Sequence, residues 1–236
     1  MAKLASIITS VYNSADQISG LLEDMKRQTF FDLCEWVFVD AASPQNEFEM
    51  IKPFAKAHDN VILHRLEEDK GVYDTWNFAI KSSSSPYVSN WNCDDRRAPW
   101  ALERQIKTLD ENPSIDLVYN GILETPKPNE TFECNSAQSM WPCLDFSKEN
   151  LHQVNSPHNC PMWRRSLHDD FGYFNTAYVS AGDYEMWVRA VVGGAKFLKI
   201  PEPLALYYRN PKGVSTHPRT IEESVEEFEE IRSKLL

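Results

Sequence analysis

Short apolar runs alternate with longer segments of helical spacing over the first hundred residues of the chain. The runs are rich in β-branched residues and end at turn residues, which predicts buried strands. The longer segments repeat apolar side chains every three or four positions, which predicts helices that connect parallel strands. The expected strands are residues 5–9, 36–40, 61–64, 87–91 and 117–120. This order predicts an α/β fold with a mostly parallel central sheet flanked by helices.

The pattern becomes irregular after these strands. Proline and polar residues are frequent over 125–159, which predicts a long, partly ordered excursion. Helical spacing returns over 184–192 and ends at two glycines, and strand-like runs follow at 196–200 and 204–208. These elements predict a second lobe.

The C-terminal segment, residues 220–236, places its apolar side chains on one stripe and many glutamates elsewhere. This spacing predicts an amphipathic helix, which is expected to pack against its own domain. Helices that lie on membranes are usually rich in lysine and arginine on their polar face, so the glutamates disfavour that role. A partner interface is the alternative.

Length and composition predict one globular domain. With 236 residues, of which 42% are hydrophobic, the chain can bury a substantial core. Its five cysteines are an odd number without C-x-x-C spacing, which argues against a disulfide framework or zinc cluster and favours the cytoplasm. No stretch reaches the roughly 18 apolar residues of a membrane span, so neither membrane insertion nor secretion is expected. The oligomeric state stays open, a homodimer included.

The net charge of −11 disfavours nucleic acid as a partner, because a polyphosphate meets a repulsive average field and no basic patch is visible. An anionic nucleotide can still bind an acidic protein through a divalent cation placed between carboxylates and phosphate oxygens. The charge therefore favours a metal site.

Polar residues follow the expected strands, and ligands of open α/β sheets bind beyond the carboxyl ends of the strands. The first strand runs into Thr9, Val11, Tyr12 and Asn13, and the second ends at Asp40. Asp40 can accept hydrogen bonds from a nucleobase N–H or a ribose hydroxyl. A helix N-cap or a turn is the alternative for this residue.

A third polar segment starts with Asp69 and Lys70 and runs into a helix. Gly71 permits close approach of the backbone to a ligand. Asp74 and Asn77 are three positions apart and share a helix face, where both could bind one polar group. An ordinary capped helix is the alternative.

The fourth segment carries the most distinctive chemistry. Directly after the strand at 87–91 come Asn92, Cys93, Asp94 and Asp95. Adjacent carboxylates repel each other unless a cation is present. Mn²⁺ or Mg²⁺ takes oxygen ligands from one or two carboxylates together with substrate phosphates, so this turn predicts a metal site that holds a diphosphate. Capping of the next helix, near Pro99, is the alternative.

These segments resemble the motifs of family 2 glycosyltransferases, which adopt the Rossmann-like, type A nucleotide-diphospho-sugar transferase fold. The resemblance covers most of residues 4–210. It is carried by residues 11–13, 39–40, 70–77, 92–95 and 181–189.

The resemblance implies an enzyme that moves a sugar, with inversion, from a UDP-, GDP- or dTDP-sugar to a hydroxyl of a glycan or another acceptor. Asp40 would contact the base or ribose, and Asp69 and Lys70 would line the donor pocket. Asp94 would bind the metal, and Asp183 would deprotonate the acceptor hydroxyl.

The resemblance also divides the single domain, 1–236, into three parts. The nucleotide-sugar-binding half is about 1–97, the acceptor-binding half about 98–218, and the C-terminal helix about 219–236. Asn92 stands where the family often has Asp, which leaves Asp94 as the principal metal ligand. Asp95 would then orient Asp94 or cap the next helix.

Further residues lie in family positions near the acceptor or the phosphates. His158 and His217 are candidate ligands of the metal or diphosphate, and the candidate phosphate or acceptor contacts are Arg164, Arg165 and Arg209. A nucleotidyltransferase is an alternative function, disfavoured because no glycine-rich basic loop follows the first strand. A catalytically silent sugar- or nucleotide-binding module is another, disfavoured because Asp94 and Asp183 are both present.

Overall fold

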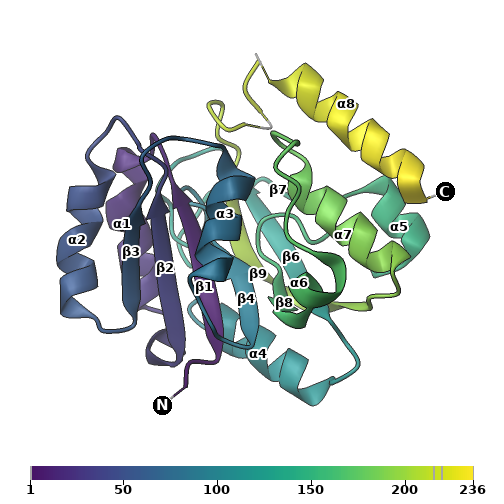
Figure 1. Ribbon diagram of the computed structural model, residues 1–236, viewed down its shortest axis with the longest axis horizontal. Helices are drawn as coiled ribbons and strands as arrows, with labels where there is room; N and C mark the ends of the chain where they lie inside the picture. Colours follow the sequence, from purple (N-terminus) through teal and green to yellow (C-terminus); the bar gives the residue numbers. More distant parts are fainter. Residues whose placement is uncertain (1, 215, 219, 236) are drawn as a thin grey trace.

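The computed structural model describes residues 2–214, 216–218 and 220–235, in which one sheet of nine strands organises the chain (Figure 1). The strand order is β3-β2-β1-β4-β8-β6-β9-β5, with β7 paired to β6. The strands are β1 (Ala5–Val11), β2 (Cys34–Asp40), β3 (Val61–Arg65), β4 (Tyr87–Asn90), β5 (Arg96–Arg97), β6 (Leu117–Thr125), β7 (Ser139–Met140), β8 (Met162–Arg164) and β9 (Phe197–Tyr208). β1 to β4 are parallel, as are β6 and β9, whereas β8 runs antiparallel between β4 and β6. The predicted α/β fold with a mostly parallel sheet is confirmed.

Helices cover both faces of the sheet. Those that carry core residues are α1 (Ala15–Lys26), α2 (Glu47–Ala57), α3 (Val72–Lys81), α4 (Ala101–Glu111), α5 (Lys148–Gln153), α6 (Ser166–Phe171), α7 (Gly182–Val192) and α8 (Ile221–Arg232). α1, α2 and α4 pack on one face, and α3, α6 and α7 on the other (Figure 1). Successive strand residues alternate between the two cores: Ile7 and Phe38 belong to the first, Ile8 and Val39 to the second.

The second half differs from the sequence expectation in its strands. β9 is one strand where the pattern predicts two, because Pro201 and Pro203 interrupt the apolar run but not the pairing with β6. The register shifts beside Gly121, where an added Cβ would lie 3.1 Å from the Cα of Pro203. β5, β7 and β8 escaped prediction because two or three residues are too few for a periodic pattern.

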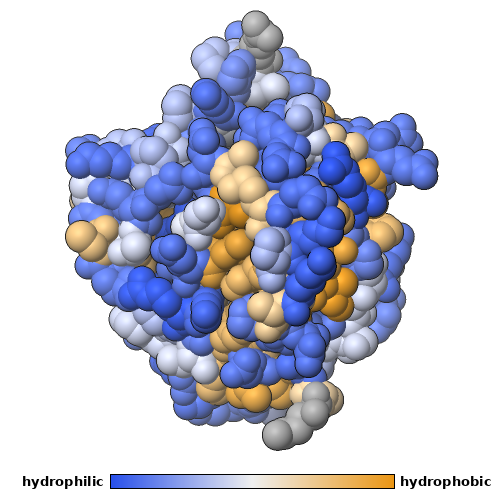
Figure 2. Space-filling view, turned by 90° about the vertical axis from the view of Figure 1, so that its left-hand side faces the viewer, coloured by the Kyte–Doolittle hydropathy of each residue, from blue (hydrophilic) through white to orange (hydrophobic). Residues whose placement is uncertain are grey.

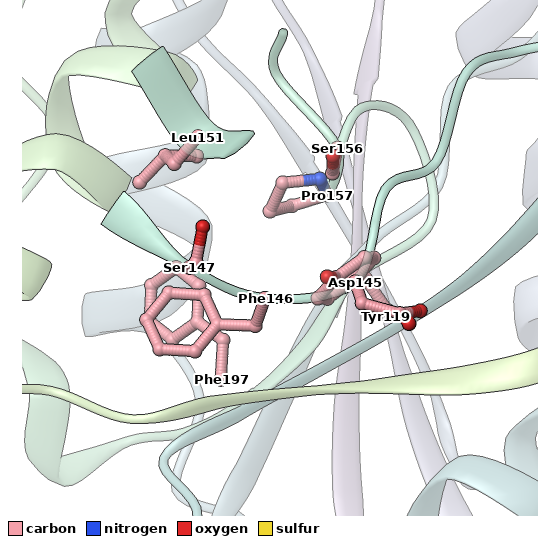
Figure 3. A pocket seen from close by; sticks show the side chains of 8 residues that line it. All are labelled: Tyr119, Asp145, Phe146, Ser147, Leu151, Ser156, Pro157 and Phe197. Atoms are coloured by element: carbon pink, nitrogen blue, oxygen red, sulfur yellow. The ribbon is translucent and has the colours of Figure 1, made fainter. Parts of the chain in front are cut away.

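The excursion between β6 and β8 is held against the sheet by specific contacts. Tyr119 on β6 donates a hydrogen bond to Leu144 O at 2.6 Å, and the rings of Phe146 and Phe197 lie 5.2 Å apart. Figure 3 shows the hollow that remains beneath this segment. Its lining consists of Tyr119, Asp145, Phe146, Ser147, Leu151, Ser156, Pro157 and Phe197. With a volume of about 10 Å³ the hollow has room for about one water molecule, and it is far smaller than typical ligand pockets of roughly 300–1,000 Å³.

α8 packs against α7, as its apolar stripe predicts. The rings of Phe228 and Tyr184 stack with centroids 4.4 Å apart. At the start of α8, Ile221 and Val225 stay 44% and 57% exposed, so only the later part of the stripe is covered. Leu236, the last residue of the predicted helix, lies outside the described residues.

Figure 2 looks onto the side of the molecule that carries α2 and the edge strand β3. This face is largely hydrophilic, with one hydrophobic band near its middle. At this edge the partly buried side chains of Ile62, Leu63 and Leu66 pack against the two cores. In the described part of the chain, no helix is both long and apolar enough to cross a membrane.

Candidate functional site

The carboxyl ends of β1, β2 and β4 meet at one edge of the sheet because these strands are parallel. Val11 is paired in register with Asp40. The Cys93 thiol donates a hydrogen bond to Ser10 O at 3.4 Å, which ties the turn after β4 to the end of β1. Burial raises the pKa of Cys93 to about 12, so this thiol stays protonated. Three of the four polar segments therefore adjoin each other.

Asp40 is fully buried at the end of β2. Its Oδ1 accepts a hydrogen bond from Ser43 N at 2.7 Å, and Arg65 Nη1 lies 3.9 Å from its Oδ2. Burial raises the pKa of this carboxyl, whereas the hydrogen bond from Ser43 lowers it. α2 begins only at Glu47, so Asp40 is not its N-cap. Asp40 closes a turn with Oδ1 and leaves Oδ2 without a hydrogen bond from the described residues.

The residues after β1 divide between the core and the surface. The side chains of Thr9 and Val11 are buried, so a ligand near Val11 would meet its backbone and not its side chain. Tyr12 is 43% exposed, and Asn13 is exposed with a φ of 49°. Asn13 N donates to Ser43 Oγ at 3.1 Å and thereby joins the turns after β1 and β2. Tyr12 and Asn13 are the side chains of this segment that face solvent.

The segment before α3 is an exposed turn. Asp69 Oδ1 accepts a hydrogen bond from Gly71 N at 2.8 Å. Gly71 has a φ of 94°, which a glycine adopts without steric cost. Lys70 is exposed and lies 2.9 Å from Glu68 Oε1, and Asp74 is half-buried in the first turn of α3. The segment thus presents charged side chains on a short, tightly turned backbone.

Asn77 has a structural role. Its Nδ2 donates to Phe174 O at 2.8 Å, and its Oδ1 accepts from Phe174 N at 3.0 Å. Both polar groups of the buried amide are therefore satisfied by the segment before α7. The expectation that Asn77 and Asp74 bind one ligand together is wrong for Asn77, because its side chain points into the protein.

The two carboxylates after β4 differ in burial and partners. Asp95 is 2% exposed, and its oxygens accept hydrogen bonds from Asn92 Nδ2 at 3.0 Å and from Tyr208 N at 3.3 Å. Asp94 is half-buried and accepts a hydrogen bond from Asn210 Nδ2 at 2.8 Å. Within this turn, Asp95 is thus buried and fixed by hydrogen bonds, and Asp94 is the more accessible of the two acids.

Two buried arginines follow this turn without an ion pair to either acid within the described residues. Arg96 Nη1 donates to the backbone oxygens of Cys93 and Asp95, at 2.9 and 2.7 Å.

Burial first, and then the charge of Asp94, raises the pKa of Asp95 well above its usual range. Because β5 intervenes before α4 begins at Ala101, neither acid caps that helix, which removes the capping alternative.

Asp183 lies in the first turn of α7 and is half-buried. Its Oδ2 accepts a hydrogen bond from Asn155 Nδ2 at 2.9 Å. Tyr73 Oη lies 3.4 Å from Oδ1 and donates to Ser180 O at 2.5 Å. Burial raises the pKa of Asp183 to about 6, against the lowering effect of the hydrogen bond from Asn155. Sequence reasoning missed Asn155, because it lies in the irregular excursion, where no periodic pattern singles it out.

His158 belongs to an aromatic cluster with Trp141 and Tyr207. Its ring centroid lies 4.1 Å from that of Trp141 and 4.8 Å from that of Tyr207. Burial lowers the pKa of His158 to about 4, so the imidazole is neutral near pH 7. Trp141 Nε1 donates to Asn155 O at 3.1 Å, on the residue that also contacts Asp183. The aromatic cluster therefore connects the surroundings of Asp183 with the end of β9.

Two of the arginine expectations are wrong. Arg164 is paired with Tyr87 at the start of β4, and Arg165 Nε donates to Ser85 O at 2.6 Å. Because β8 runs antiparallel to β4, both arginines lie at the opposite edge of the sheet from the acidic turn. Arg209 remains exposed near the end of β9, with Nε 3.9 Å from Glu124 Oε1.

His217 lies in the turn after β9, where its backbone N–H donates to Gly213 O at 2.8 Å. Asn210, at the start of this turn, is the residue that contacts Asp94. Ser215, two residues before this histidine, lies outside the described residues. The turn therefore reaches the acidic residues through Asn210.

Fold and site together define a class of protein, a Rossmann-like α/β protein whose strand-end carboxylates suit a nucleotide and a hard cation. Residues 6–171 match the family model of Glycosyl transferase family 2. The chain therefore belongs to glycosyl transferase family 2, and it has the type A fold. The resemblance seen in the motifs is confirmed.

Individual relatives agree with this assignment. The uncharacterized glycosyltransferase MJ1057 of Methanocaldococcus jannaschii is 25% identical over 218 residues, which cover 88% of this chain and 71% of that protein. S. aureus TarS 1-349 in complex with UDP-GlcNAc has a TM-score of 0.77 at 20% identity, covering 98% of this chain and 66% of that one. The mannosyltransferase PcManGT from Pyrobaculum calidifontis, in complex with GDP-Man and Mn²⁺, has a TM-score of 0.71 at 17% identity, covering 99% and 69%. The chain spans 71%, 62% and 31% of the length of three curated relatives that it matches.

Proposed function

We propose that the chain transfers a sugar from a nucleotide diphosphate to an acceptor hydroxyl, with inversion at the anomeric carbon. The observation that carries the proposal is the connection between Asp183 and the acidic turn. Asp183 is held by Asn155, the aromatic cluster links Asn155 to the end of β9, and β9 donates a backbone hydrogen bond to Asp95. A candidate base that these contacts join to a pair of candidate metal-binding acids suits the two partners of a glycosyl transfer.

The donor would bind along residues of about 1–97. Asp40 would accept a hydrogen bond from the base or ribose through its unbonded Oδ2. The exposed Tyr12, Asn13 and Lys70 would line the same pocket. TarS is described with UDP-GlcNAc and PcManGT with GDP-Man, which supports a nucleotide-sugar donor and leaves UDP and GDP as the first bases to test.

The acidic turn fits a divalent cation. Asp95 is buried without an ion pair among the described residues, and its pKa is raised first by burial and then by the charge of Asp94, so a cation would favour the ionised form of both acids. Carboxylate oxygens are the donors that Mn²⁺ and Mg²⁺ prefer, and one or two of them suffice when substrate phosphates complete the shell. Asp94 would be the protein ligand, and Asp95 would orient the turn. A bound ion supplies positive charge against the departing diphosphate.

Asp183 would act as the general base. Its carboxylate would take the proton of the acceptor hydroxyl as the oxygen bonds to the anomeric carbon and the bond to the diphosphate oxygen breaks. Attack from the side opposite the leaving group inverts the anomeric centre in one displacement, without a covalent nucleophile. The acceptor would be a glycan or another hydroxyl compound bound along residues of about 98–218.

Nucleoside diphosphate release is the direct test of this function. With Mn²⁺, the protein is expected to release UDP, GDP or dTDP from at least one sugar nucleotide, and EDTA is expected to abolish the release until metal is restored. The metal dependence follows from the uncompensated charge at the acidic turn.

The thermal unfolding midpoint with each nucleotide serves as the control, because a bound ligand stabilises the folded state. A raised midpoint without release would indicate a silent binding module. Neither release nor a raised midpoint with any nucleotide would contradict the proposal.

The rate of transfer is expected to rise with pH through about 6. Burial raises the pKa of Asp183 to about 6, and only the ionised carboxylate can accept a proton, so below this pKa the rate is expected to drop about tenfold per pH unit. The measurement is kcat at saturating donor and metal, which removes the pH dependence of binding. Residual activity of Asp183→Asn should lack this acidic limb, and a wild-type profile that stays flat across pH 6 would count against Asp183.

A further inference from the structure

One glutamate of α8 binds the backbone directly ahead of Asp183. Glu227 Oε1 accepts a hydrogen bond from Val179 N at 2.6 Å. Its Oε2 accepts from Ser180 N at 2.9 Å and from Ala181 N at 2.8 Å. A single carboxylate thus binds three successive N–H groups at the start of α7, where the helix dipole also favours a negative charge.

The loop that Glu227 holds is also fixed from its other side. Tyr73 on α3 donates a hydrogen bond to Ser180 O at 2.5 Å. In the peptide group between Ser180 and Ala181, Tyr73 therefore binds the C=O and Glu227 binds the N–H. Gly182 packs against Tyr73, and a Cβ there would lie 2.7 Å from the ring. Asp183 follows Gly182 directly, so its position depends on the contacts that the loop makes with Tyr73 of α3 and Glu227 of α8.

α8 is anchored well enough to serve as a support. Ile231 is fully buried, and Phe228 stacks on Tyr184 of α7. Tyr178 Oη donates to Glu230 Oε1 at 2.9 Å, just before the loop. Glu227 directly precedes Phe228 on this helix and is half-buried, whereas its neighbour Glu226 is exposed. The carboxylate of Glu227 is therefore held at a defined distance from α7.

We infer that Glu227 is a positioning residue for Asp183, and that α8 is a functional part of the active site through this contact. The inference rests on the proposed role of Asp183 as general base. Without the carboxylate, three backbone N–H groups lose their common acceptor, and the turn that carries Asp183 gains freedom. A displacement of about 1 Å at a reacting group can lower a rate about 10²-fold.

Glu227→Gln tests this positioning role. The carboxamide has one acceptor oxygen and a nitrogen that only donates, so it cannot serve all three N–H groups. With the sugar nucleotide that the wild type turns over, kcat is expected to fall about 10- to 100-fold. The donor Kd is expected to change by less than about twofold, because the donor residues lie on other segments. Amide hydrogen exchange over 179–181 is expected to accelerate.

Glu226→Gln is the matched control, since it makes the same charge change at the adjacent exposed position of α8 and should leave kcat and exchange unchanged. Glu227→Asp keeps the charge on a shorter side chain and should retain more of kcat than Glu227→Gln. If the glutamine variant folds poorly, the aspartate variant still tests the positioning role. Wild-type kcat in Glu227→Gln overturns the inference. A fall in kcat that a smaller folded fraction accounts for overturns it as well, because the role is then stability alone. No turnover by the wild type contradicts the proposed function instead, so the two failures are distinct.

Discussion

Replacement of Asp183 by asparagine is expected to lower the rate of sugar transfer about 10²- to 10⁴-fold, the contribution of a positioned general base. The amide cannot take the proton of the acceptor hydroxyl, yet it matches the shape of the carboxyl between Asn155 and Tyr73. Donor binding is expected to be spared, because Asp183 lies on α7 and the donor segments follow β1, β2, β3 and β4. Transfer kinetics and the donor Kd, measured on one preparation, separate the two effects.

Asp170→Asn provides the control for this variant, since Asp170 is an exposed acid on α6 and loses the same charge. It is expected to behave like the wild type in both measurements. Undiminished transfer by Asp183→Asn would remove this residue as the base and leave the proposed mechanism without a proton acceptor on α7.

Asp94→Asn is expected to weaken metal-dependent binding of the nucleotide itself. Even residues that only support a metal ligand typically contribute about 10- to 100-fold in metal affinity, so loss of a direct ligand should cost at least as much. The variant should need a correspondingly higher Mn²⁺ concentration for half-maximal activity. Calorimetric titration of UDP or GDP with and without Mn²⁺ measures the change directly.

The pattern of loss distinguishes the two aspartates. Asp94→Asn should lose binding and transfer together, whereas Asp183→Asn should lose transfer alone. Asp59→Asn, an exposed acid after α2, controls for the change in net charge. If Asp94→Asn bound the Mn²⁺ and nucleotide pair as tightly as the wild type, the metal would have to be held elsewhere.

The donor side of the site was largely predictable from local sequence. Runs of β-branched residues specify the parallel strands, and parallel strands bring their carboxyl ends to one edge of the sheet. Asp40 and Asp94 follow such runs directly, so their approximate location needs no tertiary information. The turn at Asp69 and Gly71 is local as well, because its hydrogen bond spans two residues.

The arginines at the end of β8 show where local reasoning ends. Arg164 resembles a phosphate contact by type and by its position in the chain. The direction of a strand of three residues is decided by its neighbours, and β8 pairs antiparallel with both β4 and β6. That reversal moves Arg164 to the far edge of the sheet, where it pairs with Tyr87.

The hydrophobic pattern of this chain specified the strands β1, β2, β3, β4 and β6, the helices between the first of them and the acids at the strand ends, because each depends on residues a few positions apart. Tertiary structure decided the surroundings of Asp183. Tyr73 is 110 residues from this aspartate and Asn155 is 28 residues away, so only the packing of α3 and the excursion brings them together. Glu227 and Glu226 are indistinguishable as polar positions of one amphipathic helix. The way α8 packs on α7 turns one of them toward the loop ahead of Asp183 and leaves the other in solvent.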